Sequence, residues 1–270
     1  MGCPTTIIEI ASSCGSNLPG VKTLAIGNFG DYSFTYKYYK ADGTETADPA
    51  QAVLDADGNP IKSSIAGATL GAGANAMTTF AFRKNTASAT NTLTVNDNGT
   101  NFYTNAITCY FPKQDTFKRL SIMSLVQGET CALVEDKNGK WWLYGHDEYL
   151  TVSEQTTETG AAPSDSNGYN VTLSVDEKAL PLPVSTSAMQ TMLGIQTYTV
   201  SISAGSNGTV AVNGVSGNYS QSVVNGTVLT LTATGDAGYE FDQWSDADST
   251  NPRTLTVTAD VTLTASFQVE

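Results

Sequence analysis

Residues 131–145 read Cys-Ala-Leu-Val-Glu-Asp-Lys-Asn-Gly-Lys-Trp-Trp-Leu-Tyr-Gly, and this stretch decides the fold. Two apolar runs flank residues 136–139, Asp-Lys-Asn-Gly, where asparagine and glycine accept the positive φ angles of a tight turn. The pattern predicts a β-hairpin. Trp141 and Trp142 are adjacent, so a regular strand points them to opposite faces of its sheet. We therefore expect at least one of them to reach a neighbouring subunit.

A helix is predicted directly before the hairpin, over residues 116–127. Asp115 can cap its first turn, and Gly128 can end it. The apolar residues that recur three apart are Phe117, Leu120 and Met123, with Ile122, Leu125 and Val126 beside them. We expect this helix to be largely buried, against a sheet or against a neighbouring subunit.

The residues before the helix read as short strands joined by turns. From Tyr32 to Tyr38, aromatic side chains alternate with Ser, Thr and Lys, which predicts a strand with one core-facing and one solvated face. Residues 41–79 are rich in Ala, Gly, Asp and Thr and read as a long loop or as an arm ordered by a neighbour. Asp55 and Asp57 begin like a calcium loop, but Pro60 stands where that loop needs glycine, which favours a plain turn.

Composition and charge argue against nucleic-acid binding and for a mainly β fold. The 270 residues include 13 Lys and Arg against 26 Asp and Glu, a net charge of −13. Binding to a nucleic-acid backbone needs basic side chains, so this balance predicts repulsion from DNA. Sparse charge and abundant Gly, Thr, Ser and Asn favour a mainly β protein over one with long surface helices.

The sequence contains no recognisable catalytic or cofactor motif, and we expect neither an enzyme nor a metal protein. The four cysteines form no C-x-x-C pair, which argues against zinc. His146 is the single histidine and reads as a turn residue beside Asp147 and Glu148. There is no nucleophile elbow and no phosphate loop. No apolar run reaches membrane-spanning length, and the first residues do not resemble a secretory signal.

A domain boundary is predicted near residue 184. Residues 185–196 form a linker with one short helical turn, and residues 197–270 form a small all-β module in which apolar and hydroxyl residues alternate. This module holds seven acidic residues against Arg253 alone. Part of the negative charge therefore belongs to the module.

The C-terminal module resembles the internalin-type repeat module of bacterial surface proteins. The resemblance rests on Tyr198–Ile202, Gly226–Ala233, Gly238–Trp244, Asn251-Pro252 and Leu263–Phe267. Within it, Tyr239, Phe241 and Trp244 have two readings, as glycan contacts or as core positions, and their alternating spacing favours the core.

The segment from the helix to Val184 resembles a phage tail tube (major tail) protein. The order of parts carries this resemblance: the helix with Leu120 and Leu125, the hairpin over 133–145, Gly160, residues 165–169 (Asp-Ser-Asn-Gly-Tyr) and residues 171–173 (Val-Thr-Leu). It implies a β-sandwich or barrel-like core over residues 1–184, flanked by one buried helix. It also implies stacked, hexameric rings of identical subunits, with residues 41–79 as an arm. The expected assembly residues are Phe117, Leu120, Met123, Trp141 and Trp142.

The two resemblances together predict a structural virion protein, a tail tube subunit that carries an outward-facing accessory domain. Its partners would be further copies of itself, other tail or connector proteins, and genomic DNA that passes without specific binding. It would assemble in the host cytoplasm and remain in the virion tail. The alternative is an adhesin or fibre-like surface protein that binds host glycans through the C-terminal module.

Overall fold

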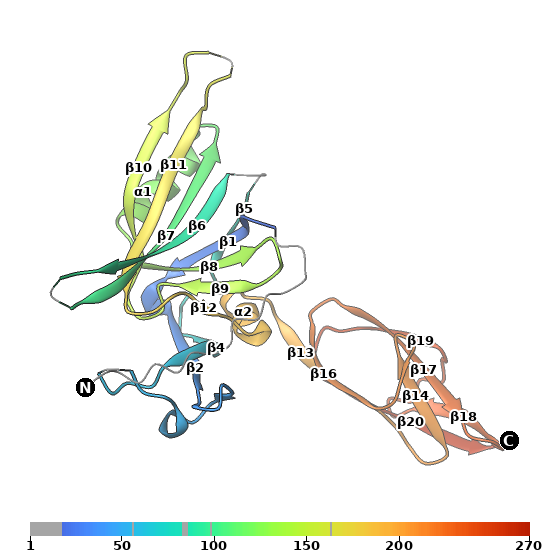
Figure 1. Cartoon of the computed structure of the whole chain (residues 1–270). Coiled ribbons are helices and arrows are strands. Elements are labelled where there is room, and N and C mark those ends of the chain that lie inside the picture. The colour runs from blue at the N-terminus through green and yellow to red at the C-terminus, as the bar shows by residue number, and fades with distance from the viewer. Residues whose placement is uncertain (1–17, 56, 83–85, 98, 163) are drawn as a thin grey trace. The chain divides into compact units, whose positions relative to one another are not determined.

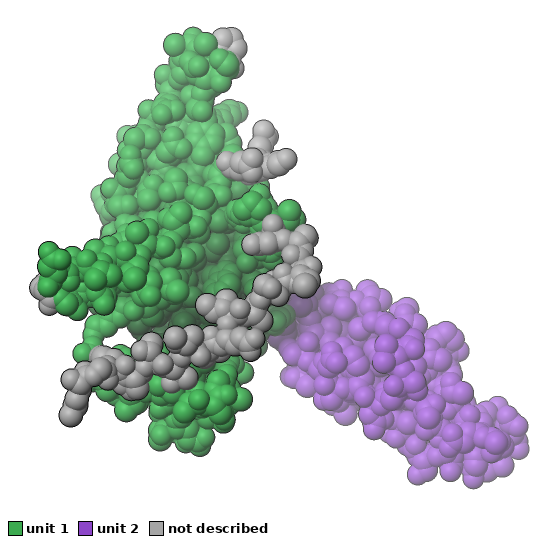
Figure 2. Space-filling model, viewed as in Figure 1, with its two compact units in different colours: residues 1–194 green, residues 195–270 purple. Residues whose placement is uncertain are grey.

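The computed structural model (Figure 1) describes residues 18–270 except 56, 83–85, 98 and 163. The described chain is mainly β, as predicted, with two helices, and none of its sheets closes into a barrel. It divides into two compact units, residues 1–194 and residues 195–270, coloured separately in Figure 2. Each unit is built around its own core.

Unit 1 contains three sheets and both helices. The first sheet has the order β12-β9-β8-β1-β5 and consists of Leu182–Pro183, Trp141–Tyr144, Thr130–Asp136, Val21–Asn28 and Thr78–Ala81. The second has the order β10-β11-β7-β6 and consists of Thr151–Glu158, Gly168–Glu177, Asn101–Pro112 and Ala87–Val95. The third has the order β3-β2-β4 and consists of Glu45–Thr46, Tyr32–Tyr39 and Lys62–Leu70. The helices are α1 (Thr116–Val126) and α2 (Thr186–Met192), and two short 3₁₀ turns span Phe29–Asp31 and Pro49–Gln51.

The predicted hairpin is confirmed as β8 and β9. The strands are antiparallel and place Leu133 opposite Leu143 and Val134 opposite Trp142. The Asp136 Oδ1 atom accepts hydrogen bonds from the backbone N–H groups of Asn138 at 2.8 Å and Lys140 at 3.0 Å. Gly139 has φ +82°, the left-handed conformation that glycine adopts without steric cost.

Unit 1 has two cores, and β8 supplies both. Ala132 and Val134 point into a core between the first and second sheets, where Ile107, Val171 and Leu173 are fully buried. Cys131 and Leu133 point the other way, into a core with the third sheet and α2. The aromatic face of β2 also enters this second core, which confirms the alternation predicted for Tyr32 to Tyr38.

Residues 41–79 differ from the long loop or arm that the sequence predicts. Their second half contains β4, which pairs with β2 along its length. Ile65 of β4 is fully buried, and Met77 is buried close to β5. The weak apolar pattern of this segment hid a strand, because only alternate residues of β4 need to be apolar to join the core.

The helix α1 has the predicted bounds but not the predicted burial. Asp115 caps it by accepting a hydrogen bond from the backbone N–H of Lys118 at 2.9 Å. Only Ile122 is buried within the chain, and Leu125 is half-buried. Phe117 is 83% exposed and Leu120 is 55% exposed. Of the two predicted forms of burial, the one against a sheet of its own chain is therefore wrong for most of the helix, because its apolar positions wind around more than one face, and burial against a neighbouring subunit stays a prediction.

The segment that the sequence assigned to a linker contains α2. Ser185 caps this helix and accepts a hydrogen bond from the backbone N–H of Ala188 at 3.3 Å. Ala188 and Met192 are buried in the second core. The helix therefore belongs to unit 1, and the division between the units follows Gly194.

Unit 2 is a two-sheet β structure with one apolar core. One sheet has the order β16-β13-β20-β18, from Tyr219–Val224, Thr197–Ala204, Val261–Val269 and Tyr239–Trp244. The other has the order β15-β14-β17-β19, from Val215–Ser216, Gly208–Val212, Val228–Gly235 and Arg253–Thr256. Strands β13 and β20 run parallel, and the remaining pairs are antiparallel.

The contribution of β4 to folding can be measured with Ile65→Ala. This change leaves a cavity in the second core, and we expect it to lower the free energy of unfolding by about 2–5 kcal/mol in urea denaturation. The matched control is Leu54→Ala in the same segment, because Leu54 is 54% exposed and its truncation should have little effect. If the two changes had equal effects, β4 would not be part of the core, and the predicted loop or arm over residues 41–79 would be correct instead.

Candidate functional site

The outer face of the sheet β10-β11-β7-β6 is covered with hydroxyl groups. Its inner face holds the fully buried Ile107 and Leu173. The residues that alternate with them along each strand therefore point outward. Ser88, Thr108 and Thr172 lie opposite one another on adjacent strands, with the Oγ1 atoms of the two threonines 3.2 Å apart. The same face also carries Thr90, Thr92, Thr104, Ala106, Tyr110, Asn170 and Ser174.

This sheet contains no cation. Its four strands hold four carboxylates and no lysine or arginine. Glu154 lies opposite Thr172, and Asp176 accepts a hydrogen bond from the Thr104 hydroxyl at 2.6 Å, which places both carboxylates on the outer face. A surface of hydroxyls and carboxylates repels phosphate, since nothing on it can neutralise a negative charge.

Both long edges of this sheet are open in the described chain. Strand β10 pairs only with β11, and β6 pairs only with β7. All three pairings are antiparallel, so β6 and β10 run in opposite directions. Neither edge strand contains the lysine or proline that commonly protects such edges, and β6 exposes Leu93 and Val95.

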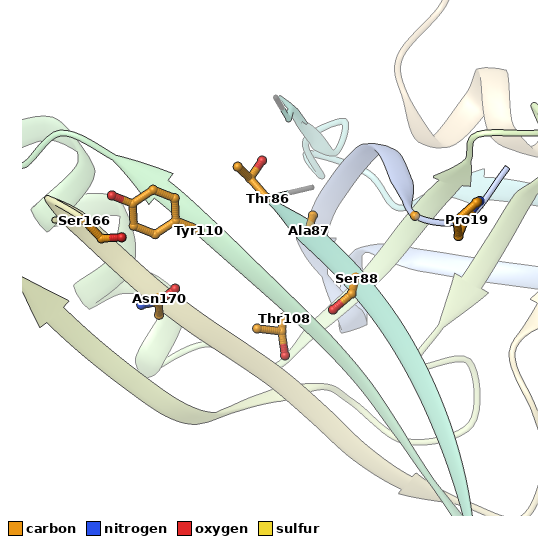
Figure 3. A pocket seen from close by; sticks show the side chains of 9 residues that line it. Pro19, Thr86, Ala87, Ser88, Thr108, Tyr110, Ser166 and Asn170 are labelled. Atoms are coloured by element: carbon orange, nitrogen blue, oxygen red, sulfur yellow. The ribbon is translucent and has the colours of Figure 1, made fainter. Parts of the chain in front are cut away.

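A shallow hollow of about 600 Å³ lies beside the start of β6. Figure 3 shows Ser88, Thr108 and Tyr110 around it, together with Asn170 of β11. Its lining contains no carboxylate, histidine, lysine or cysteine. Its only side chain of a type used in general acid–base chemistry is the Tyr110 phenol.

The predicted assembly residues on α1 are solvent-exposed. Phe117, Leu120 and Met123 are 83%, 55% and 48% exposed, and Val126, farther around the helix, is 50% exposed. Large apolar side chains gathered in this way on one helix are typical of an interaction surface. Their role in assembly remains a prediction.

The two tryptophans lie on opposite faces of β9, as the alternation predicted. Trp141 packs against the second core, and Trp142 packs against the first. The Trp142 Nε1 atom donates a hydrogen bond to Asp136 Oδ2 at 3.2 Å. Both side chains are partly buried within unit 1, and both keep some exposed surface.

His146 is held in a buried polar network. Glu177 organises the turn by accepting hydrogen bonds from the backbone N–H groups of His146 at 3.0 Å and Asp147 at 2.9 Å. Its second carboxylate oxygen accepts a hydrogen bond from the Asn105 side chain at 2.9 Å. Asp147 lies 3.3 Å from His146 Nδ1 and forms an ion pair with Lys62 of β4. The network ties all three sheets together, and sequence reasoning missed it because its members lie far apart in the chain.

Asp55 and Asp57 lie in a turn, and the described cysteines lie in the cores. No group of three or more His, Cys, Asp or Glu side chains there could hold a metal ion. Asp55 accepts hydrogen bonds from the backbone N–H groups of Asp57 and Asn59, which makes this stretch a turn. Burial raises the pKa of the Cys109 and Cys131 thiols to about 12, so neither is a reactive thiolate at neutral pH. Cys3 and Cys14 lie outside the described residues. Neither helix of the described chain is long and apolar enough to cross a membrane.

Two of the three predicted glycan contacts of unit 2, Phe241 and Trp244, belong to its hydrophobic core. Trp244 is fully buried, and its Nε1 atom donates a hydrogen bond to the backbone oxygen of Thr250 at 3.1 Å. Phe241 packs between Trp244 and Phe267, with ring centroids 5.4 and 6.3 Å apart. A buried indole has no free face for a sugar ring, so Trp244 is no glycan contact in this structure, and the glycan role of Tyr239 and Phe241 stays a prediction.

The sequence of unit 2 matches one known domain family. Residues 198–270 match the profile of the divergent InlB B-repeat domain. Unit 2 is thus a bacterial repeat module of this type. Its Asn251 makes two hydrogen bonds to the backbone of Ala233, which explains the asparagine in the Asn251-Pro252 motif. No curated protein and no solved structure matches the chain.

The polar network makes stability depend on pH through Asp147. Partial burial raises the pKa of Asp147, but the hydrogen bond with His146 and the ion pair with Lys62 outweigh it and hold that pKa well below 3.8. The stabilisation is therefore fully present above pH 3.8 and is lost as the pH falls below it. We expect Asp147→Asn to lower the free energy of unfolding at pH 7 by about 1 kcal/mol or less, since the carboxylate is partly solvated.

The difference in the free energy of unfolding between wild type and Asp147→Asn, measured by urea denaturation, should be smaller at pH 3 than at pH 7. Asp57→Asn is the control, because Asp57 pairs with Lys178 on the surface and is 60% exposed. A difference for Asp147→Asn that stays constant across this range would contradict the assignment.

Proposed function

We propose that unit 1 is the subunit of a phage tail tube, which assembles into stacked rings around a DNA conduit and carries unit 2 as an accessory domain. The observation that carries the proposal is the sheet β10-β11-β7-β6, with two open edges and an outer face that lacks cations. The open edges allow strands of neighbouring copies to pair. The outer face, which lacks cations, suits the wall of a conduit for DNA.

Ring formation follows from the directions of the edge strands. Because β6 and β10 run in opposite directions, β6 of one copy can pair with β10 of the next and continue the antiparallel pattern. The contact uses different surfaces on the two copies, and a contact of this kind generates a ring when its rotation closes. The edges are also staggered, since β6 pairs with the first nine residues of β7 whereas β10 lies beside the opposite end of the sheet. Such stagger is what closure of tilted strands into a barrel requires.

The outer face suits the lining of a conduit. Phosphates that pass a wall of hydroxyls and carboxylates meet repulsion and find no counter-charge to hold them. Genomic DNA would then move through the ring without specific binding. Other tail or connector proteins would contact the ends of the tube.

The alternative function is an adhesin or fibre-like surface protein that binds host glycans. The match of residues 198–270 to a bacterial repeat family favours it, because such a module suits a surface protein. The burial of Trp244 weakens it, since the proposed sugar contact is core. A glycan array probed with the full chain separates the two functions.

Assembly can be tested by negative-stain electron microscopy of the purified chain at rising concentration. We expect rings or hollow tubes for the wild type. Leu93→Lys should abolish them, because a lysine on the open β6 edge opposes pairing with another strand. Val215→Lys is the control, with the same charge change at an exposed valine of unit 2. A wild-type protein that stays monomeric at all concentrations would overturn the proposal.

The position of the wall can be tested by cysteine labelling of assembled tubes, after Cys3 and Cys14 are changed to serine. Thr108→Cys places a thiol at the centre of the outer face. We expect a small maleimide to label it in monomer and tube, and a maleimide carried on a large globular protein to label it only in the monomer. Val215→Cys should react with both reagents in both states. Labelling of Thr108→Cys in tubes by the large reagent would place this face outside the conduit.

A further inference from the structure

Two apolar surfaces of unit 1 have complementary positions relative to the open edges. The first, the α1 ridge, consists of the exposed apolar residues Phe117, Leu120 and Met123. The second, the β6 groove, is an open groove of about 600 Å³ lined by Ala89, Val134, Trp142, Tyr144, Leu180 and Pro181. Leu180 is 48% exposed at its rim. Each surface leaves apolar area in contact with water, which disfavours the isolated subunit.

The α1 ridge lies along β10. Before the helix begins, the Gln114 side chain donates a hydrogen bond to the backbone oxygen of Glu158, the last residue of β10. After the helix ends, Thr130 and Leu150 exchange two backbone hydrogen bonds directly before β10 begins. The helix therefore runs beside this edge strand from one end to the other.

The β6 groove lies at the opposite edge. Ser88, Ala89 and Asn91 of β6 form one wall, and Trp142 and Tyr144 of β9 form another. Ala89 and Tyr144 also belong to the first core, as do Ile122 and Leu125 of α1. The ridge and the groove are therefore both on the inner side of the sheet β10-β11-β7-β6, at its two ends.

We infer that the α1 ridge of one copy docks in the β6 groove of the next copy. The inference rests on the proposed function, because pairing of β10 with β6 brings a ridge and a groove to the same side of one continuous sheet. Charge agrees with this partner. Helix α1 contains Lys118 and Arg119 and no acidic residue, whereas Asp136 is the charged residue in the lining of the groove.

The docked helix would add side-chain specificity to the backbone pairing. Strand pairing by itself tolerates slips in register, because every backbone N–H and C=O group is alike. Apolar side chains that dock in a groove lined by Trp142 fit at only one position of the helix along that groove. The ridge and groove thus select the register at which the ring forms.

The first test compares charged variants of the full chain by electron microscopy and sedimentation. We expect Leu120→Glu and Leu180→Glu each to raise the concentration needed for assembly by about tenfold or more, with unchanged urea unfolding of the monomer. Leu54→Glu is the matched control, because Leu54 and Leu120 are equally exposed, at 54% and 55%, and Leu54 lies in neither surface. The pair Leu120→Lys with Leu180→Glu should recover part of the loss, since the two charges would then face each other between copies.

The second test is cross-linking between copies, with Cys3 and Cys14 changed to serine. A mixture of Leu120→Cys and Leu180→Cys proteins should form a disulfide-linked heterodimer on oxidation, whereas a mixture of Leu54→Cys and Leu180→Cys should not. If the wild type forms rings but the Leu120 and Leu180 variants assemble normally and do not cross-link, the docking inference fails and the ring proposal stands. If the wild type forms no rings, the proposed function fails first.

Discussion

The structure of unit 1 depends on a single strand that is buried on both faces. Strand β8 is hydrogen-bonded to β9 on one side and to β1 on the other, so neither edge is free. Its residues from Cys131 to Glu135 are all buried, and alternate side chains enter two different cores. Because burial of apolar area is the dominant favourable term in folding, a strand that serves two cores couples their stability. Loss of β8 would remove the common wall of both.

Different parts of unit 1 provide its stability and its proposed function. The inner faces of the sheets and the polar network around Glu177 hold the subunit together. The outer face of the sheet β10-β11-β7-β6 carries mainly hydroxyl and carboxylate groups, with Phe102 and Tyr110 among them, and its edges stay unpaired in the described chain. A self-assembling subunit needs this division, since an edge that was satisfied within the monomer would have nothing to offer a neighbour.

The exposed apolar residues of α1 make sense in the same terms. A monomer gains nothing from a helix that presents Phe117 to water, but a ring gains by covering it. Unit 2 follows the opposite logic. Its largest aromatic side chain, Trp244, is wholly buried, and the solvent-facing positions of its strands carry hydroxyl groups together with a few exposed valines such as Val228 and Val269. It is a module of a bacterial repeat type with its own hydrophobic core.

The sequence by itself determined the local features. The hairpin around Gly139, the cap of α1 at Asp115 and the alternating face of β2 follow from turn chemistry, capping and periodicity, which act over a few residues. The module at the C-terminus was visible in the same way. In each case the residues that fix the feature are neighbours in the chain.

Only the tertiary structure decided which surfaces meet. It paired β4 with β2, buried α2 in unit 1, left the ridge of α1 in solvent and gathered His146, Glu177 and Asn105 into one network. Periodicity states that a helix or strand has an apolar face, but it does not state what covers that face. That choice depends on segments tens of residues away, because burial is a property of the packed chain and not of any one stretch of it.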